Sequence, residues 1–321
     1  MRYASIDAGT NTFRLLIAEA DGRGNIKPLV YKRAITRLGG SYTEEGGINE
    51  ASAERAIRAL EGFSKEIAAS GVKDVHATAT SVVRRAVNRP WFLDEVFRRT
   101  GIRLSVITGD EEARLSLLGV LSVLKDAPHR RLVMDIGGGS TEFIAAEGAA
   151  LSGAWSMEMG VVHLTERHLK SDPPKPTEIS GMEAEIKGVM GELKARMEKD
   201  GADPEDFSAG RGAALAGTAG TITTLAAMDM DLQAYDAGRV DNYTLAKKRV
   251  AEIYRHLAGL TLKEREGILS LEKGREDLIV AGAAITLLSM DAFGFDAIKV
   301  SDAGLLEGII IDRASRAVKE G

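Results

Sequence analysis

The chain has 321 residues, of which 44% are hydrophobic and 28% charged, and its formal net charge is −5. This composition is ordinary for a globular protein, and the length exceeds the usual size of one hydrophobic core, so two domains are expected. The acidic balance argues against a nucleic-acid or membrane-surface role, and the absence of cysteine excludes disulfides, thiolate catalysis and cysteine-ligated metal.

The first half alternates strands and helices. An antiparallel meander is predicted at 3–7, 13–19 and 28–32, with a turn at Asp21 and Gly22. A helix is predicted from Asn49, which can serve as N-cap, to Gly71. The remaining elements are a strand at 75–78, a helix from Pro90 to Gly101, a strand at 104–108 and a helix at 109–124.

The second half repeats this alternation. Strands are predicted at 132–146 (a hairpin), 151–157, 213–216 and 298–301, and helices at 161–169 and 304–319 and from about 244, 261 and 274. Ser180 and Glu183 predict a capping box that opens a long helix ending near Gly201. The apolar run at 278–290 is too short to span a bilayer and predicts a buried helix. Because Asp7 interrupts the first apolar run, no signal peptide is expected, and the default location is the cytoplasm.

Two stretches with the same pattern stand out. In residues 132–146 an apolar run ends on Asp135, three glycines and two hydroxyl residues follow, and a second apolar run begins. Residues 4–18 repeat this pattern, so that Asp7 aligns with Asp135 and Gly9 with Gly137. Two such copies in register indicate an internal duplication.

Three turns rich in glycine and hydroxyl groups lie at predicted strand ends, at 9–12, 137–141 and 217–221. Backbone N–H groups in such turns bind anions, and the third turn also lies at a helix N-terminus. Together the turns predict a cleft between two related domains that holds a phosphate chain and Mg²⁺. A plainer alternative is that they are hairpin turns and a helix cap. A Walker A loop, a His-Glu-x-x-His metal site and a Gly-x-Ser-x-Gly elbow are all absent.

The order of several motifs resembles one family. The motifs are DAGTNTFRLLI, ATATSVVRRAVN, TGDEEARLSLLGV, DIGGGSTEF, GTAGTITTLAAM, REDLIVAGAAI and VSDAGLLEGII. They occur in the order seen in the exopolyphosphatase / guanosine pentaphosphate phosphohydrolase (Ppx/GppA) family, which belongs to the actin, sugar kinase and Hsp70 superfamily. The resemblance implies an α/β fold of two ribonuclease-H-like domains with mixed sheets flanked by helices and an active site in the cleft between them. The domains are expected at 1–125 with 304–321 and at 126–303.

The resemblance also implies an activity, which is hydrolysis of a terminal phosphoanhydride of polyphosphate with Mg²⁺ or another divalent cation. Glu112 would be the base that activates water, and Asp135, Glu142 and Asp7 would lie at the metal. Without the resemblance, Glu112 could simply be an acid favoured by the helix dipole. The phosphate-binding residues would be Gly9, Thr10, Asn11, Thr12, Arg14, Arg84, Gly137, Gly138, Gly139, Ser140, Thr141, Gly217, Thr218 and Gly220.

The chain departs from the family pattern in two ways. Leu306 replaces an arginine, so any substrate contact by that arginine is lost. The extra C-terminal helical domains of longer members are absent from this sequence, which puts processivity on long polymers in doubt. Three alternatives stay open: hydrolysis of guanosine pentaphosphate, an ATP-dependent kinase or ATPase of the same superfamily, and a non-hydrolytic alarmone or nucleotide sensor. Nucleic acid and membrane are not expected as partners, and the oligomeric state is left open, with a homodimer as one option.

Overall fold

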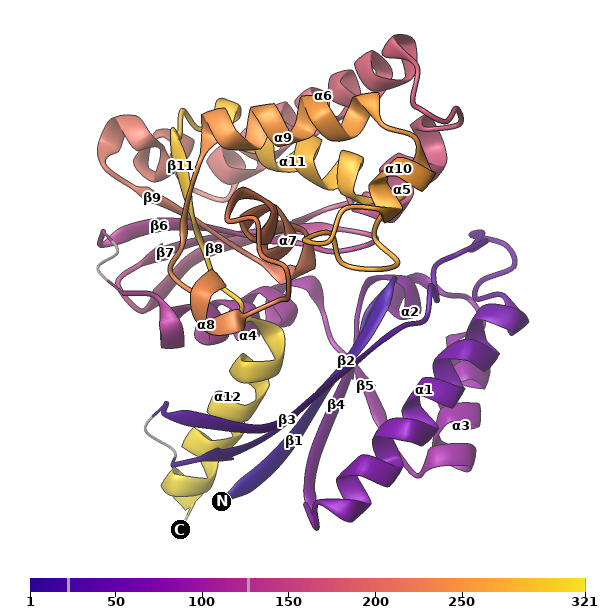
Figure 1. Ribbon diagram of the computed structural model, residues 1–321. Helices are drawn as coiled ribbons and strands as arrows, with labels where there is room; N and C mark the ends of the chain where they lie inside the picture. Colours follow the sequence, from indigo (N-terminus) through magenta and orange to yellow (C-terminus); the bar gives the residue numbers. More distant parts are fainter. Residues whose placement is uncertain (22–23, 126–127, 321) are drawn as a thin grey trace. The chain divides into compact units, whose positions relative to one another are not determined.

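The structure is a computed structural model that describes residues 1–21, 24–125 and 128–320, with only the backbone described for 318–320. The chain divides into two compact units, which we call unit 1 (Met1–Ser122 with Ala303–Gly321) and unit 2 (Val123–Asp302). Figure 1 shows the elements of each unit. The fold is α/β, with one mixed sheet flanked by helices in each unit, as predicted.

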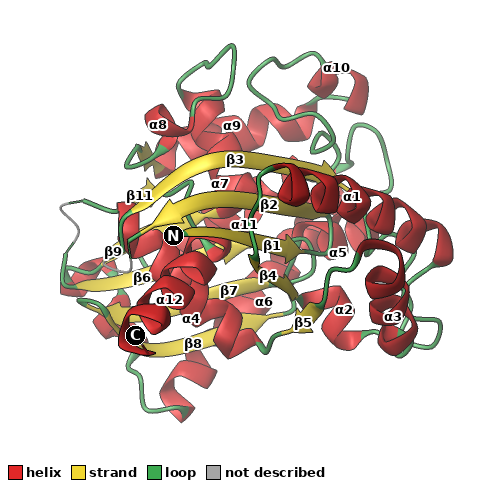
Figure 2. Cartoon of the chain, turned by 90° about the horizontal axis from the view of Figure 1, so that it is seen from below, coloured by secondary structure: helices red, strands yellow, loops and turns green. Residues whose placement is uncertain are grey.

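Unit 1 contains a five-stranded sheet of order β3-β2-β1-β4-β5. Its strands are β1 (Arg2–Ala8), β2 (Thr12–Ala20), β3 (Ile26–Ile35), β4 (Asp74–Ala79) and β5 (Leu104–Val106). Its helices are α1 (Glu50–Ala69), α2 (Ser81–Arg85), α3 (Arg89–Thr100), α4 (Gly109–Val123) and α12 (Leu305–Glu320). Figure 2 shows β3, β2 and β1 side by side. The β1–β2 and β2–β3 pairs are antiparallel, which confirms the predicted meander.

Apolar side chains lie on both faces of this sheet. Ile6 and Leu15 point to one face, where they pack with Leu60 of α1 and with α3. Tyr3 and Leu16 point to the other face, where α12 covers them. Leu306 belongs to this second core and is 2% exposed. A charged side chain at this position would be buried without water, so the leucine serves packing.

Unit 2 contains a six-stranded sheet of order β10-β11-β9-β6-β7-β8. Its strands are β6 (Arg130–Ile136), β7 (Thr141–Glu147), β8 (Ala150–Met157), β9 (Ala214–Thr218), β10 (Thr244–Ala246) and β11 (Ala297–Val300). Its α-helices are α5 (Val161–His168), α6 (Pro176–Lys199), α7 (Ala219–Asp229), α8 (Ala237–Val240), α9 (Lys247–Gly259), α10 (Leu262–Glu266) and α11 (Ile279–Ala292). Two 3₁₀ turns lie at Pro204–Phe207 and Ala209–Arg211.

The two sheets share one topology. Read from β3 to β5 and from β8 to β11, the strands follow the same order, and each contains an antiparallel hairpin whose first strand pairs in parallel with a later strand. The hairpin registers are also equivalent, since Asp7 lies opposite Arg14 and Asp135 lies opposite Glu142. The duplication predicted from the sequence is therefore present in the strand pairing.

The apolar run near the C-terminus forms α11, most of whose residues are buried, as predicted. Alanine, glycine and β-branched residues make it narrow enough to pack against α5, α6, α7 and α9. No helix in the described part of the chain is long and apolar enough to cross a membrane.

Several predicted boundaries were wrong. The long helix α6 begins at Pro176, where the Glu178 carboxylate accepts from the Lys175 N–H at 3.0 Å, and Ser180 lies inside the helix. Proline is well suited to the first helical position, and this signal outweighs the Ser180–Glu183 pair. Residues 244–246 form β10, so α9 begins only at Lys247, and α11 begins at Ile279 rather than 274. The predicted turn at Asp21 and Gly22 lies partly outside the described residues.

The contact between α4 and α12 depends on glycine. A Cβ on Gly308 would lie 1.8 Å from the backbone oxygen of Leu115, and a Cβ on Gly119 would lie 1.9 Å from that of Gly304. These neighbours are backbone atoms, so the two helices would have to move apart to accept any side chain.

Gly308→Ala is therefore expected to destabilise unit 1 by about 1–3 kcal/mol, as overpacking usually does. The matched control is Gly62→Ala, since Gly62 is exposed on α1 with no atom near its missing Cβ. This control should stabilise by about 0.5–1 kcal/mol. Chemical denaturation of both variants tests the prediction, and equal effects of the two substitutions would contradict it.

Candidate active site

The first glycine turn closes the β1–β2 hairpin. The Gly9 N–H donates to the carbonyl oxygen of Thr12 at 3.3 Å, and a Cβ on Gly9 would lie 2.9 Å from that oxygen. Thr10 and Asn11 are buried, and their carbonyl oxygens accept from the backbone N–H groups of 36, 37 and 39. The turn is thus held in one conformation by the segment that follows β3.

Asp7 lies near the end of β1, beside the same turn, and forms an ion pair with Arg14. The Arg14 guanidinium donates to Asp7 Oδ2 from Nη2 at 2.6 Å and from Nε at 3.1 Å. Asp7 is 4% exposed, and its other oxygen, Oδ1, has no hydrogen-bond partner among the described residues. Asp7 therefore keeps one buried acceptor while its charge is balanced by Arg14.

The second glycine turn has the same closure. The Gly137 N–H donates to the carbonyl oxygen of Ser140 at 2.9 Å, and a Cβ on Gly137 would also lie 2.9 Å from that oxygen. The carbonyl oxygens of Gly137 and Gly138 accept from the first N–H groups of α5 at 3.1 and 2.9 Å. Gly160 allows this approach, since a Cβ there would lie 2.3 Å from the Gly138 oxygen.

Two acids meet beside the second turn. Asp135 and Glu142 are direct cross-strand neighbours, and they are 8% and 2% exposed. Ser140 and Ser156 each donate a hydroxyl hydrogen bond to Glu142 Oε1 at 2.8 Å. Glu142 thus occupies the place that Arg14 has in the first hairpin, so an acid stands where the first hairpin has a base.

This donor set fits a divalent cation. Two buried carboxylates side by side repel each other, and a cation between them removes that cost. Mg²⁺ typically takes one or two protein carboxylates and completes its shell with water and substrate phosphate. In the described residues no group of three or more His, Asp and Glu side chains has metal-binding geometry.

The third glycine turn joins β9 to α7. Thr218 precedes the helix, and Ala219 has a positive φ of 67°, a conformation that is uncommon for a residue with a Cβ. A Cβ on Gly220 would lie 2.0 Å from Nη2 of Arg275, so this guanidinium lies against the start of α7. A Cβ on Gly217 would lie 2.6 Å from Cδ1 of Ile298, which gives this glycine a packing role.

The third turn has a counterpart in unit 1, at Thr78, that was not predicted from the sequence. Thr78 lies beside Asp7 in the β1–β4 register, as Thr218 lies beside Asp135 in the β6–β9 register. In each unit the strand that ends near this threonine leads into a helix, α2 or α7. The signal was available, because both stretches contain a threonine between small residues at the end of an apolar run. Ser156 and Arg275 were missed for a different reason, since only the folded chain brings them to the second and third turns.

Glu112 lies in the first turn of α4 and is buried, with 9% exposure. Arg84 Nη1 donates to Glu112 Oε2 at 3.1 Å and to the carbonyl oxygen of Ile107 at 2.8 Å. The neighbouring Glu111 is partly exposed and takes two hydrogen bonds from Arg114, the main cause of its lowered pKa. The helix dipole explains an exposed acid such as Glu111, but it does not explain a buried acid held by an arginine from another helix.

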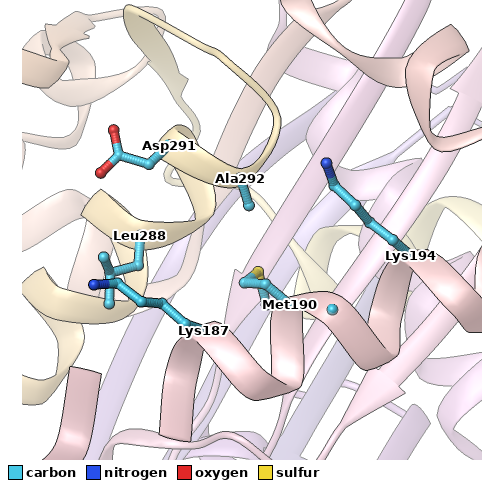
Figure 3. A pocket seen from close by; sticks show the side chains of 7 residues that line it. Lys187, Met190, Lys194, Leu288, Asp291 and Ala292 are labelled. Carbon is cyan, nitrogen blue, oxygen red and sulfur yellow. The ribbon is translucent and has the colours of Figure 1, made fainter. Parts of the chain in front are cut away.

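A groove in unit 2 lies apart from these turns. It has a volume of about 360 Å³ and runs between α6 and α11. Figure 3 shows Lys187, Met190 and Lys194 on one side and Leu288 and Asp291 on the other. None of its lining residues belongs to the glycine turns or to the acids described above, so we do not include it in the candidate site.

The two matching hairpins, each with a buried acid at a glycine turn, define a duplicated α/β protein. The sequence profile of the Ppx/GppA phosphatase family matches residues 16–317, and the chain belongs to this family. It is accordingly an enzyme of the phosphoanhydride hydrolase class.

Individual relatives cover nearly the whole chain. Exopolyphosphatase 2 of Mycobacterium tuberculosis is 31% identical over 98% of this chain and 98% of its own. The crystal structure of the Ppx/GppA family member from Aquifex aeolicus is 32% identical, with a TM-score of 0.80 over 100% of this chain and 99% of that one. An exopolyphosphatase from Cytophaga hutchinsonii is 28% identical, with a TM-score of 0.87 over 98% of each chain.

Proposed function

We propose that this enzyme removes the terminal phosphate of inorganic polyphosphate, with water as the acceptor and a divalent cation bound. The observation that carries the proposal is the pair of equivalent hairpins, in which a buried acid ends one strand beside a glycine turn. Relatives that cover the whole chain are named exopolyphosphatases, which favours polyphosphate over guanosine pentaphosphate.

Asp135 and Glu142 would hold the cation, and Mg²⁺ suits their oxygen ligands. When bound, the cation would neutralise charge on the phosphate oxygens and stabilise the transition state. Ser140 and Ser156 would keep the Glu142 carboxylate in one orientation through their hydroxyl groups. Asp7 would be the third acid at the metal and would act through Oδ1, because Arg14 occupies Oδ2.

The glycine turns would bind the phosphate groups. Gly9 and Gly137 use their own N–H groups to close the turns, and the hydroxyl groups of Ser140 and Thr141 donate to Glu142 and to the Met159 carbonyl oxygen. The phosphate would therefore take the remaining donors, which are the hydroxyl and backbone N–H groups at 10–12 and the backbone N–H groups at 138–141. Thr218 and Gly220 would add the N-terminus of α7, where the helix dipole favours an anion. Gly217 would support this turn by packing, as its contact with Ile298 indicates.

Glu112 would accept the proton of the attacking water. A buried carboxylate suits this role because Arg84 fixes its direction, and the guanidinium can also contact a phosphate oxygen. Phosphoryl transfer needs a positioned water and neutralised charge more than covalent chemistry. These residues supply both.

A side-by-side measurement of phosphate release tests the proposal. The purified enzyme would be assayed with long-chain polyphosphate, guanosine pentaphosphate and ATP, each with Mg²⁺ and with EDTA. We expect the highest kcat/KM on polyphosphate and no release with EDTA. Faster release from guanosine pentaphosphate would identify the other family activity. Binding of all three without release would identify a sensor.

A further inference from the structure

A second polar groove lies in unit 1, apart from the glycine turns. It has a volume of about 260 Å³ and is bounded by β4, β5, α4 and α12. Its charged and polar lining comprises His76, Thr78, Arg103, Ser105, Glu111, Asp312, Arg313 and Arg316. The proposed hydrolysis uses none of these side chains.

The lining of this groove has more positively than negatively charged side chains. Asp312 is already paired with Arg114 at 3.0 Å and with Arg316 at 2.9 Å. Arg103 and Arg313, by contrast, form no ion pair with any side chain that the structure describes. Arg103 is also held in place, since its guanidinium lies 4.0 Å from the centre of the Phe97 ring. Two arginines without acids, on different elements of one groove, are suited to an anion.

His76 belongs to β4 and lines the groove. Burial is the largest cause of its lowered pKa, and Arg313 lowers it further, while Asp74 and Asp312 act in the opposite direction. Nε2 of His76 is buried without a well-aligned hydrogen bond, although it lies 2.5 Å from Asp74 Oδ1. The imidazole therefore adds a polar group to the lining of the groove, and it gains a proton more easily when an anion is present.

We infer that this groove is a second binding site for a phosphate group, held by Arg103 and Arg313 with Ser105 as a further hydrogen-bond donor. Guanidinium groups match the oxygen spacing of phosphate, and the volume accommodates a small oxyanion with several waters. The phosphate group has two sources, which are free orthophosphate and a segment of a polyphosphate chain. The inference does not depend on hydrolysis by the candidate active site.

The groove also borders on the hydrogen bonds that hold Glu112 in place. Ile107 lines the groove, and its carbonyl oxygen accepts the hydrogen bond from Arg84 Nη1, the same atom that donates to Glu112. Ile107 would therefore contact both a phosphate in the groove and the Arg84 side chain that holds Glu112.

The test follows the imidazole signal of His76 by NMR in the full-length protein, which has only five histidines. Orthophosphate and tripolyphosphate are titrated separately, with sodium chloride at equal ionic strength as the reference. We expect a saturable upward shift of the His76 titration midpoint, because an anion in the groove offsets the repulsion from Arg313. Asp74, Asp312 and Glu111 also face this region, and their charges are the same in all arms.

The double variant Arg103→Ala/Arg313→Ala should weaken this response at least about tenfold, as expected for loss of two charge-assisted contacts. The control Arg58→Ala/Arg98→Ala removes the same charge from exposed arginines on α1 and α3 and should leave the response unchanged. A response to orthophosphate assigns the site to the free ion, and a response to tripolyphosphate alone assigns it to the chain. Equal responses to chloride, or an undiminished response in the double variant, would overturn the inference. Phosphate release is measured in parallel, so a failure of the proposed hydrolysis would leave the His76 result readable.

Discussion

Glu112→Gln is expected to lower the rate of phosphate release from polyphosphate by about 10²–10⁴-fold, the range typical of losing a general base. The amide keeps the size of the side chain and can still accept from Arg84, so the fold and substrate binding should persist. Steady-state kinetics give the loss in kcat, and equilibrium binding of polyphosphate to the variant shows whether affinity is retained.

The adjacent acid supplies the control. Glu111 lies on the same helical turn, but its carboxylate is partly exposed and engaged by Arg114. Glu111→Gln removes the same charge at almost the same place and should change kcat less than threefold. If both variants lost activity equally, the loss would reflect the charge of this helix end, and the assignment of Glu112 would fail.

Asp135→Asn is the second substitution with a large expected effect. It removes half of the negative charge from the Asp135–Glu142 pair, so we expect the Mg²⁺ concentration for half-maximal activity to rise by at least about 10–100-fold, the loss seen even for groups that only support a metal ligand. Titration of activity with Mg²⁺ measures this change.

Asp7→Asn is the equivalent substitution in the first hairpin, and its effects are compared with those of Asp135→Asn. Here the cross-strand partner is Arg14, and the substitution removes the buried negative charge that accepts two hydrogen bonds from its guanidinium. We expect lower stability and a smaller change in Mg²⁺ requirement than for Asp135→Asn. The reverse order of the two Mg²⁺ effects would move the proposed cation from the second hairpin to the first.

Much of this architecture could be predicted from the sequence because the determinants are local. The apolar runs on either side of Asp7 and Asp135 fix two hairpins, and glycine at 9 and 137 fixes the turn, since any Cβ there would meet a backbone oxygen. Asn49 caps α1 as its position predicts, with its side chain accepting from two backbone N–H groups.

What could not be predicted depends on contacts between distant segments. Nothing in the sequence near Glu142 indicates that Ser156 would donate to it, because that contact requires the β7–β8 register. The difference between the two hairpins could not be predicted either. The cross-strand neighbour of Asp7 is the basic Arg14, whereas that of Asp135 is the acidic Glu142, and these neighbours are defined only by the strand register. The start of α6 was misplaced because two competing cap signals lie close together.

The packing of α12 against β1 and β2 has a consequence for biosynthesis. Tyr3 and Leu16 are translated before unit 2, whereas the side chains that cover them, including Leu306 and Ile310, are translated after it. The nascent chain must therefore carry an uncovered apolar sheet face while all of unit 2 is being translated. We expect chains stalled before residue 305 to be cleaved readily within β1 and β2 and released full-length chains to resist, which limited proteolysis of ribosome-bound intermediates would measure.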